Sequence, residues 1–296
     1  MPESRPILVT GGSGQLALAL EAAGGTQVRR VGRPAFDFDR PATIPDVFGT
    51  VSPRLVVNAA AYTAVDAAEG DKDAAYRANR DGPAILARLC ADAGVPLIHV
   101  STDYVFDGTK GAPYVETDPV APSGVYGASK LAGEQAVLAT GARAMVVRTA
   151  WVYSAIGRNF VCTMLNAGRT RDRLTVVSDQ FGCPTTAGDL ARAILGVAEA
   201  IAVNGWREEY SGVFHAAGTG ATSWHGLATA VFEEAARHGM KVPVVAPITT
   251  AEWPTPVTRP ADSRLDCGKL ARVFGVRLPP WRASLGPVVA AILAAA

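Results

Sequence analysis

The sequence predicts an α/β fold in which helices cover both faces of a doubly wound, mostly parallel sheet. Short apolar runs bounded by glycine, proline or polar residues alternate with helical patterns along the first half of the chain. A glycine-rich turn joins the first apolar run, at 7–9, to the first helical pattern. The length of 296 residues is enough for one large domain and a smaller one.

Composition excludes several classes of function. The formal net charge is +1 and no block of like charge occurs, so we expect no nucleic-acid or anionic-membrane partner. The four cysteines are scattered without a C-x-x-C pair, which indicates reduced thiols rather than a disulfide framework or a zinc site. The sequence has no signal-peptide pattern and no apolar run near the ~20 residues of a membrane span. We therefore expect a cytoplasmic protein.

The glycine-rich turn carries the first functional signal. Gly12-x-Gly14-x-x-Ala17 matches the dinucleotide fingerprint, and Gly11 begins an overlapping pattern of the same kind. Glycines allow the backbone to approach a pyrophosphate, which lies at the N-terminus of the following helix. A turn without a ligand is the alternative, but the strand–turn–helix context favours a nucleotide. The pattern predicts a Rossmann-type sheet with a nicotinamide cofactor.

The second strand suggests which cofactor is used. It covers 28–31 and runs into Gly32 and Arg33, with no acid in the position that would hold the ribose hydroxyls of NAD. The forked donors of Arg33 suit a 2′-phosphate, although a solvated loop charge is an alternative interpretation. We expect NADPH as cofactor, with NADH possible. Phe38 could border the adenine.

The remaining pattern predicts the domain organisation. We expect an NAD(P)-binding Rossmann domain over residues 1–150. A smaller, mainly substrate-binding domain should cover 151–296, with some segments returning to the main sheet. The predicted strands cover 55–58, 95–100, 144–149, 174–177 and 213–215, and the predicted helices cover 72–79, 82–93, 159–167, 187–200 and 224–237.

Tyr126 and Lys130 are the candidate catalytic pair. Their spacing places them on one face of a helix. The helix follows a strand that ends near Thr102, at the carboxyl edge where parallel sheets bind ligands. A free tyrosine has a pKa of about 10, and we expect Lys130 and an oxidised nicotinamide to favour the tyrosinate. The set suits ketone reduction, with Tyr126 as proton donor and a hydroxyl that binds the carbonyl oxygen.

Several other residues allow two interpretations. His99 lies inside a predicted strand, where a core role is favoured over catalysis. Asn79 either faces the cofactor-side helices or makes core hydrogen bonds. Trp151 follows a strand end and either fills the core or stacks on a sugar, and we favour substrate contact. The loop over 107–124 is long for a compact domain and could cover substrate.

At this point the motifs resemble those of extended short-chain dehydrogenase/reductases, and within them the family of dTDP-4-dehydrorhamnose reductases. The resemblance spans nearly the whole chain. Its motifs are Asn58-Ala-Ala-Ala-Tyr-Thr-Ala-Val-Asp66, Ser101-Thr-Asp-Tyr-Val-Phe-Asp-Gly108, Val125-Tyr-Gly-Ala-Ser-Lys-Leu-Ala-Gly-Glu134, Arg148-Thr-Ala-Trp-Val-Tyr153, Asp179-Gln-Phe-Gly-Cys-Pro-Thr185, Thr222-Ser-Trp-His225 and Arg259-Pro-Ala-Asp-Ser-Arg-Leu265.

The resemblance implies roles for particular positions. Catalysis would rest on Thr102, Tyr126 and Lys130, and the sugar nucleotide would contact Thr102 and Asp103, with Trp151 against the deoxysugar ring. The cofactor would be lined by Gly14, Gln15, Leu16, Asp37, Phe38, Ala61, Tyr62 and Thr63.

The implied reaction is the NADPH-dependent reduction of the 4-keto group of dTDP-4-dehydro-6-deoxy-L-mannose to dTDP-L-rhamnose. A reductase or epimerase of another dTDP-hexulose is an alternative, and a non-catalytic regulatory subunit is another. Related dehydratases have a second acid after the aspartate, where this chain has Tyr104. Some members are described as dimers bridged by Mg²⁺ through acids that include one on the first helix. Ala19 occupies that position here, so we predict no metal, while a homodimer stays possible.

Overall fold

The computed structural model of this chain describes residues 5–295 and contains a central six-stranded parallel sheet. The strand order is β10-β5-β4-β3-β1-β2, and every neighbouring pair is parallel. The chain leaves β1 for β2 on one side and then crosses back to β3 on the other. This reversal creates a crevice between the carboxyl ends of β1 and β3. The strands are β1 (Ile7–Thr10), β2 (Val28–Arg30), β3 (Leu55–Asn58), β4 (Leu97–Thr102), β5 (Ala144–Thr149) and β10 (Gly212–His215).

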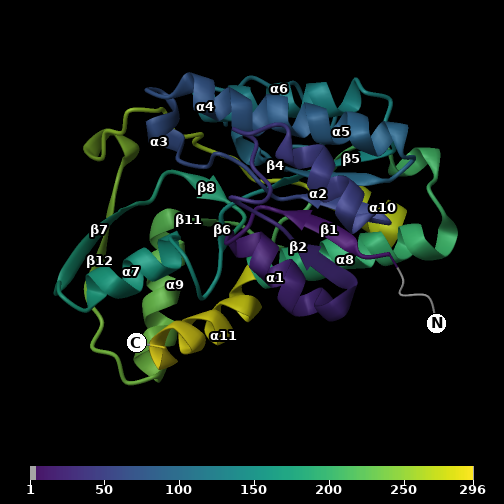
Figure 1. Cartoon of the computed structure of the whole chain (residues 1–296). Helices are drawn as coiled ribbons and strands as arrows, with labels where there is room; N and C mark the ends of the chain where they lie inside the picture. The colour runs from purple at the N-terminus through teal and green to yellow at the C-terminus, as the bar shows by residue number, and fades with distance from the viewer. Residues whose placement is uncertain (1–4, 296) are drawn as a thin grey trace.

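Helices cover both faces of the sheet, which confirms the predicted fold class (Figure 1). Successive strand residues point to opposite faces, so Leu8 and Val56 pack in one core while Val9 and Val57 pack in the other. One core lies under α2 (Thr43–Val51), α5 (Gly82–Asp92) and α6 (Val125–Leu138), and the other lies under α1 (Gln15–Gly24), α8 (Ala187–Asn204) and α10 (Gly268–Phe274). Within residues 5–295, none of the helices has the length and apolar character needed to traverse a lipid bilayer.

The structure differs from the sequence prediction in how some elements end. The helices predicted over 72–79 and 82–93 form one continuous rod, in which a π-helical segment, Arg77–Asp81, joins α4 (Lys72–Tyr76) to α5. Pro83 is the second residue of α5 and directly follows the junction with the π-helical segment. The strand predicted from residue 95 begins at Leu97 and ends at Thr102, as expected, and α2 was not predicted because Pro45 and Gly49 weaken its helical pattern.

A second group of elements lies beside the sheet, away from the N-terminus (Figure 1). It has its own apolar core, which includes Leu165, Leu227 and Val289. In the same part of the chain, β10 pairs with β5 and joins the main sheet. The group contains α7 (Phe160–Gly168), α9 (Trp224–Arg237) and α11 (Trp281–Ala294), with the strand pairs β6 (Val152–Tyr153) and β9 (Thr185–Thr186), β7 (Arg173–Val177) and β12 (Val244–Ile248), and β8 (Phe181–Gly182) and β11 (Thr222–Ser223).

Candidate active site

The glycine-rich turn lies in the crevice between β1 and β3. Gly11 has a φ of 110°, and a Cβ built on it would come within 2.9 Å of the carbonyl oxygen of Ala59. Only glycine fits this conformation and this approach. Gly14 precedes α1 with no side-chain cap and no acid in the first helical turn, so backbone N–H groups are left for an anion. These features fit the pyrophosphate of a dinucleotide.

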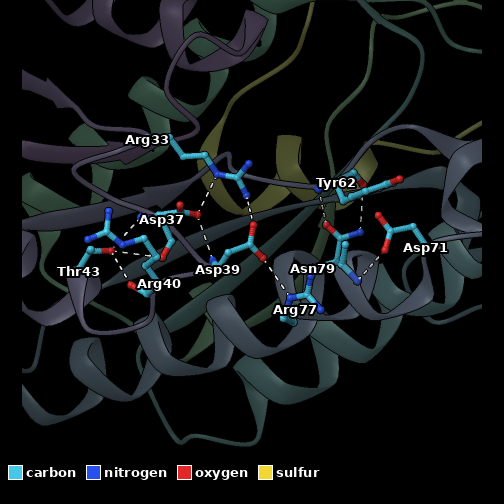
Figure 2. A network of polar contacts seen from close by, with 10 residues as sticks. Arg33, Asp37, Asp39, Arg40, Thr43, Tyr62, Asp71, Arg77 and Asn79 are labelled. Atoms are coloured by element: carbon cyan, nitrogen blue, oxygen red, sulfur yellow. Dashed lines mark hydrogen bonds and ion pairs between the residues drawn. The ribbon is translucent and has the colours of Figure 1, made fainter.

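Arg33 lies beyond the end of β2 and contacts two acids (Figure 2). Its Nε donates to Asp37 at 2.8 Å, and its terminal nitrogen donates to Asp39. Asp39 also accepts a hydrogen bond from Arg77 at 3.1 Å, which links the loop to the π-helical segment. The Arg33 side chain is 65% exposed. The sequence contains no acid at the strand end, but folding brings two carboxylates to Arg33 from the following loop.

Two predicted cofactor residues have their side chains in the core. The Leu16 side chain packs between α1 and the sheet. Phe38 contacts Phe36 edge-on in the core under α2 and α5. Both are less than a tenth exposed. Their side chains serve packing, so these two positions can line a cofactor mainly through their backbone.

Gln15 hydrogen-bonds to residues far along the chain. Its side-chain oxygen accepts hydrogen bonds from Ser154 at 2.8 Å and from Asn159 at 3.0 Å. Asn159 is the N-cap of α7, so Gln15 ties the start of α1 to the second group of elements.

The loop after β3 is fastened to the candidate catalytic helix through Asn79. The Tyr62 N–H donates to Asn79 Oδ1 at 2.8 Å, and Asn79 Nδ2 donates to the Tyr62 carbonyl at 3.1 Å (Figure 2). Asn79 also donates to Ser129, whose hydroxyl donates to the Tyr126 carbonyl at 2.8 Å. Of the two interpretations of Asn79, core hydrogen bonding is the one observed. The partly or fully exposed residues Ala61, Tyr62 and Thr63 are thus held beside α6.

Tyr126 and Thr102 meet where β4 ends and α6 begins. Thr102 accepts a hydrogen bond from the Tyr104 N–H at 3.2 Å and donates to Asp103 at 3.1 Å, in the short 3₁₀ turn Asp103–Val105. The rings of Tyr104 and Tyr126 meet edge-on, with centroids 5.5 Å apart. At Gly127 a Cβ would lie 2.2 Å from the Tyr104 carbonyl oxygen, so glycine permits this close approach of helix and turn.

The electrostatics of Tyr126 differ from the sequence-based expectation. Burial raises the pKa of its phenol well above the ordinary value, and the negative charge of Asp103 raises it further, whereas the neighbouring Thr102 hydroxyl lowers it. The Lys130 ammonium donates to the Val100 carbonyl at 2.7 Å, and burial lowers its pKa to about 8. In the protein alone the expected tyrosinate is therefore disfavoured. Tyr126 is a neutral phenol that retains its proton at neutral pH.

Asp103 is a buried carboxyl with unsatisfied bonding capacity. It is 2% exposed, and its Oδ2 has no hydrogen-bond partner in residues 5–295. Burial raises its pKa to about 6, although the nearby hydroxyls of Ser263 and Thr102 lower it in part. A buried acceptor without a partner costs free energy, so Oδ2 is suited to receive a hydroxyl from a ligand.

Trp151 is held face to face with Trp224. Their ring centroids are 3.4 Å apart and their planes differ by 4°. The φ of Trp151 is 47°, which is unusual for a bulky residue and indicates local strain. A Cβ on Gly182 would lie 2.3 Å from the indole, so glycine makes room for it. Sequence reasoning selected Trp151 and missed Trp224 as its support, although Trp224 belongs to one of the motifs quoted above.

The sheet beneath these residues contains a row of buried polar side chains. The Thr10 hydroxyl donates to Asn58 at 2.6 Å, and the Asn58 amide lies 2.9 Å from His99 Nδ1. Burial lowers the pKa of His99 well below its ordinary value, so the ring is neutral. This confirms the interpretation of His99 as a core residue.

Comparison with known proteins identifies the family. The family described as RmlD substrate binding domain matches residues 5–294. The chain belongs to this family. A dTDP-4-dehydrorhamnose reductase of Sinorhizobium fredii is 44% identical over 292 residues, which cover 97% of each chain. The enzyme of the same name from Mycobacterium tuberculosis is 42% identical over 300 residues, which cover 97% of this chain and 93% of the relative.

Solved structures agree with this assignment. A dTDP-4-dehydrorhamnose reductase from Clostridium acetobutylicum superposes with a TM-score of 0.89 at 36% identity, covering 97% of this chain and 99% of that one. The enzyme of that name from Bacillus anthracis, solved in complex with NADP, superposes with a TM-score of 0.86 at 32% identity, covering 96% and 98%. Similarity therefore extends over both groups of elements.

Proposed function

We propose that this family member reduces the 4-keto group of dTDP-4-dehydro-6-deoxy-L-mannose to give dTDP-L-rhamnose, with NADPH as the reductant. The observation that carries the proposal is the meeting of Tyr126 and Thr102 at the carboxyl edge of β4, beside a glycine turn that fits a pyrophosphate. Near-full-length relatives and a related structure with NADP support the same reaction.

The backbone at Gly11 and Gly14 would hold the dinucleotide, and the bound NADPH supplies hydride for the carbonyl carbon of the substrate. Reduction also requires a proton on the carbonyl oxygen. The Thr102 hydroxyl would donate a hydrogen bond to that oxygen and stabilise the charge that develops on it. The phenol of Tyr126, which the protein keeps protonated, would transfer its proton to the same oxygen.

Lys130 would stabilise the product state of this proton transfer. It lies one helical turn after Tyr126 and is 2% exposed, so its charge acts in a poorly screened environment. Once Tyr126 has given up its proton, the nearby ammonium offsets the negative charge left on the phenolate. Lys130 would also hold the hydroxyls of the nicotinamide ribose, as the resemblance implies.

Two residues would position the sugar nucleotide. The unpartnered Oδ2 of Asp103 would accept a sugar hydroxyl, and the Trp151 indole, held by Trp224, would contact the deoxysugar ring. Tyr104 follows Asp103, and burial raises the pKa of its phenol to about 12. A phenol of this kind is a poor substitute for the second acid of a dehydratase, which favours reduction over elimination of water.

Arg33 would select the cofactor. Its guanidinium could turn from Asp37 and Asp39 to a 2′-phosphate, since all three side chains are at least partly exposed. The same two acids would repel that phosphate to some degree, and Asp37 could accept a ribose hydroxyl of NADH. We therefore expect a preference for NADPH with measurable use of NADH.

The test is the loss of NADPH absorbance on addition of freshly prepared dTDP-4-dehydrorhamnose, with chromatographic identification of the product. Stoichiometric NADPH oxidation and formation of dTDP-L-rhamnose are expected. An epimerase would convert the sugar with no net oxidation, and a regulatory subunit would do neither. If NADPH persists while a known reductase consumes it in the same assay, the proposal fails; faster turnover of another dTDP-hexulose would reassign the substrate.

Location, assembly and metal dependence stay predictions. We expect the enzyme in the cytoplasm, where the free thiols of Cys90, Cys162, Cys183 and Cys267 would remain reduced. A homodimer would be detected by light scattering. Because we predict no metal, treatment with a chelator should leave activity unchanged, and loss of activity that Mg²⁺ restores would contradict this.

A further inference from the structure

Glu134 is a buried acid on the same face of α6 as the candidate catalytic pair. It follows Tyr126 by eight residues and Lys130 by four, so the three side chains succeed one another along one face. Its side chain is only 2% exposed. Carboxylates are almost never buried to this degree without partners, so its environment requires an explanation.

Two strands provide the partners of Glu134. Arg148 of β5 donates from Nε at 2.9 Å and from Nη2 at 2.6 Å, which makes a bidentate pair. Ser101 of β4 donates its hydroxyl to the same carboxylate at 2.5 Å. Ser101 and Arg148 lie opposite each other in the register of the two strands. The carboxylate therefore fastens α6 to both strands at one level of the sheet.

A second contact between α6 and β4 lies one residue earlier on the strand. Lys130 donates to the Val100 carbonyl, and Glu134 accepts from Ser101. The next residue of the strand is Thr102, which lies beside Tyr126. Two consecutive strand residues thus fix the helix relative to the strand that carries the predicted hydroxyl donor. Loss of either hydrogen bond would change the relative positions of all three candidate catalytic groups.

Stability alone does not explain this arrangement. The desolvation cost of a buried ion pair is large, and apolar replacements of such pairs are often neutral or stabilising. The pair here is also imperfect, because the buried Nη1 of Arg148 has no hydrogen-bond partner in the described part of the chain. Arg148 instead lies over the ring of Phe106, with its guanidinium carbon 5.1 Å from the centroid. An arrangement this costly points to a role in function.

We propose that Glu134 is a positioning residue, whose carboxylate, held by Arg148 and Ser101, keeps the Lys130 ammonium charged and fixes α6 so that Tyr126 faces Thr102. The inference rests on the proposed function, because it assigns Glu134 to the same reaction. It differs from a catalytic role in that Glu134 acts through Lys130 and the helix.

The charges around this face of α6 support an electrostatic part of the role. His99 is neutral, because burial and Lys130 both lower its pKa. Burial also lowers the pKa of Lys130, to about 8, whereas the negative charge of Glu134 raises it. Loss of the Glu134 charge should therefore deprotonate Lys130 at a lower pH. The other groups packed around this face are Arg148 from β5, Asp103 and Tyr104 from the turn after β4, and Glu69, which accepts a hydrogen bond from the Val125 N–H.

The experiment compares the pH dependence of kcat/KM in wild type and Glu134→Gln. Gln keeps the shape and removes the charge, so the limb on which activity falls with rising pH should move to lower pH by roughly half a unit or more. The pH dependence of NADPH affinity, followed by fluorescence, should move in the same direction because Lys130 would hold the cofactor ribose. This second readout needs no turnover, so it separates failure of the inference from failure of the proposed reaction.

Further variants distinguish positioning from mere structural support. Arg148→Met removes the opposing cation and should not move the limb to lower pH. The double variant Glu134→Gln/Arg148→Met avoids an unpaired buried charge, should fold if the single variant does not, and should keep the shift to lower pH. Asp189→Asn is the matched control for removing the charge of a buried acid. It breaks the ion pair of Asp189 with Arg192 on α8. The inference is overturned if the Gln variants lose only thermal stability while their kcat/KM falls with rising pH over the same range as in wild type.

Discussion

Two ion-pair networks of this protein differ in burial, and the difference separates their roles. The pair of Glu134 and Arg148 is 2% and 4% exposed, whereas Arg33 in the loop of Figure 2 is 65% exposed. Loss of one partner in the buried network leaves a charge without solvent, which is costly and keeps the geometry fixed. Exposed pairs contribute about 0–1 kcal/mol and exchange partners easily. The buried network suits the geometry of the reaction, and the exposed one suits selection of a cofactor.

The largest expected effect comes from the residue that the buried network positions. Tyr126→Phe keeps the ring against Tyr104 and removes the proton donor. We expect kcat to fall by at least about 100-fold, with the NADPH dissociation constant nearly unchanged. Steady-state kinetics and a fluorescence titration measure both quantities. A variant that turns over at the wild-type rate would show that the proton comes from elsewhere.

Breaking the buried pair should be the most costly change for the fold. Arg148→Ala leaves Glu134 charged and without its bidentate partner, so the free energy of unfolding should fall by about 3 kcal/mol. Urea denaturation measures this loss. Arg33→Ala in the exposed network is the matched control. Equal losses in the two variants would remove the contrast between the networks.

Asp103 tests the cost of a buried charge without a full set of partners. Its pKa of about 6 in the folded protein lies above the ordinary 3.8, so its contribution to stability is present below pH 4 and is lost as pH rises through 6. Asp103→Asn should therefore raise the free energy of unfolding at pH 7 by on the order of 3 kcal/mol, from ~1.4 kcal/mol per pKa unit. It should also weaken sugar-nucleotide binding. An unchanged stability between pH 4 and 8 in wild type would argue against this account.

The smallest effect is expected at Arg33. Arg33→Ala should change the free energy of unfolding by less than about 0.5 kcal/mol, because its ion pairs with Asp37 and Asp39 are exposed. The KM for NADPH should rise several-fold while the KM for NADH stays near the wild-type value. If the ratio of the two KM values is the same in wild type and variant, Arg33 does not recognise the 2′-phosphate.

Local patterns predicted the parts of the structure that depend on neighbouring residues. The glycine turn at Gly11 and the strand that ends at Thr102 were predicted because apolar runs and turn residues indicate them directly. The spacing of Tyr126 and Lys130 likewise follows from helical periodicity. The strand β12 was missed because Pro247 and its flanking residues weaken the strand pattern, which an edge strand tolerates.

Other features depend on contacts between distant residues. The stack of Trp224 on Trp151 joins α9 to the segment after β5, and nothing local in either segment encodes it. The rise in the pKa of Tyr126 in the protein alone was not predicted, because burial and the orientation of Lys130 toward Val100 cannot be read from spacing. The partners of Glu134 required the register of β4 and β5.

The central claim is that this site delivers hydride to the 4-carbon of a dTDP-hexulose while Tyr126 protonates its oxygen. The most direct measurement uses NADPH that carries deuterium at the reactive position of its nicotinamide, followed by mass spectrometry and NMR of the product sugar. The account predicts one deuterium, at C4, with one NADPH oxidised for each sugar formed. Deuterium at another carbon, or a sugar product without deuterium, would contradict it.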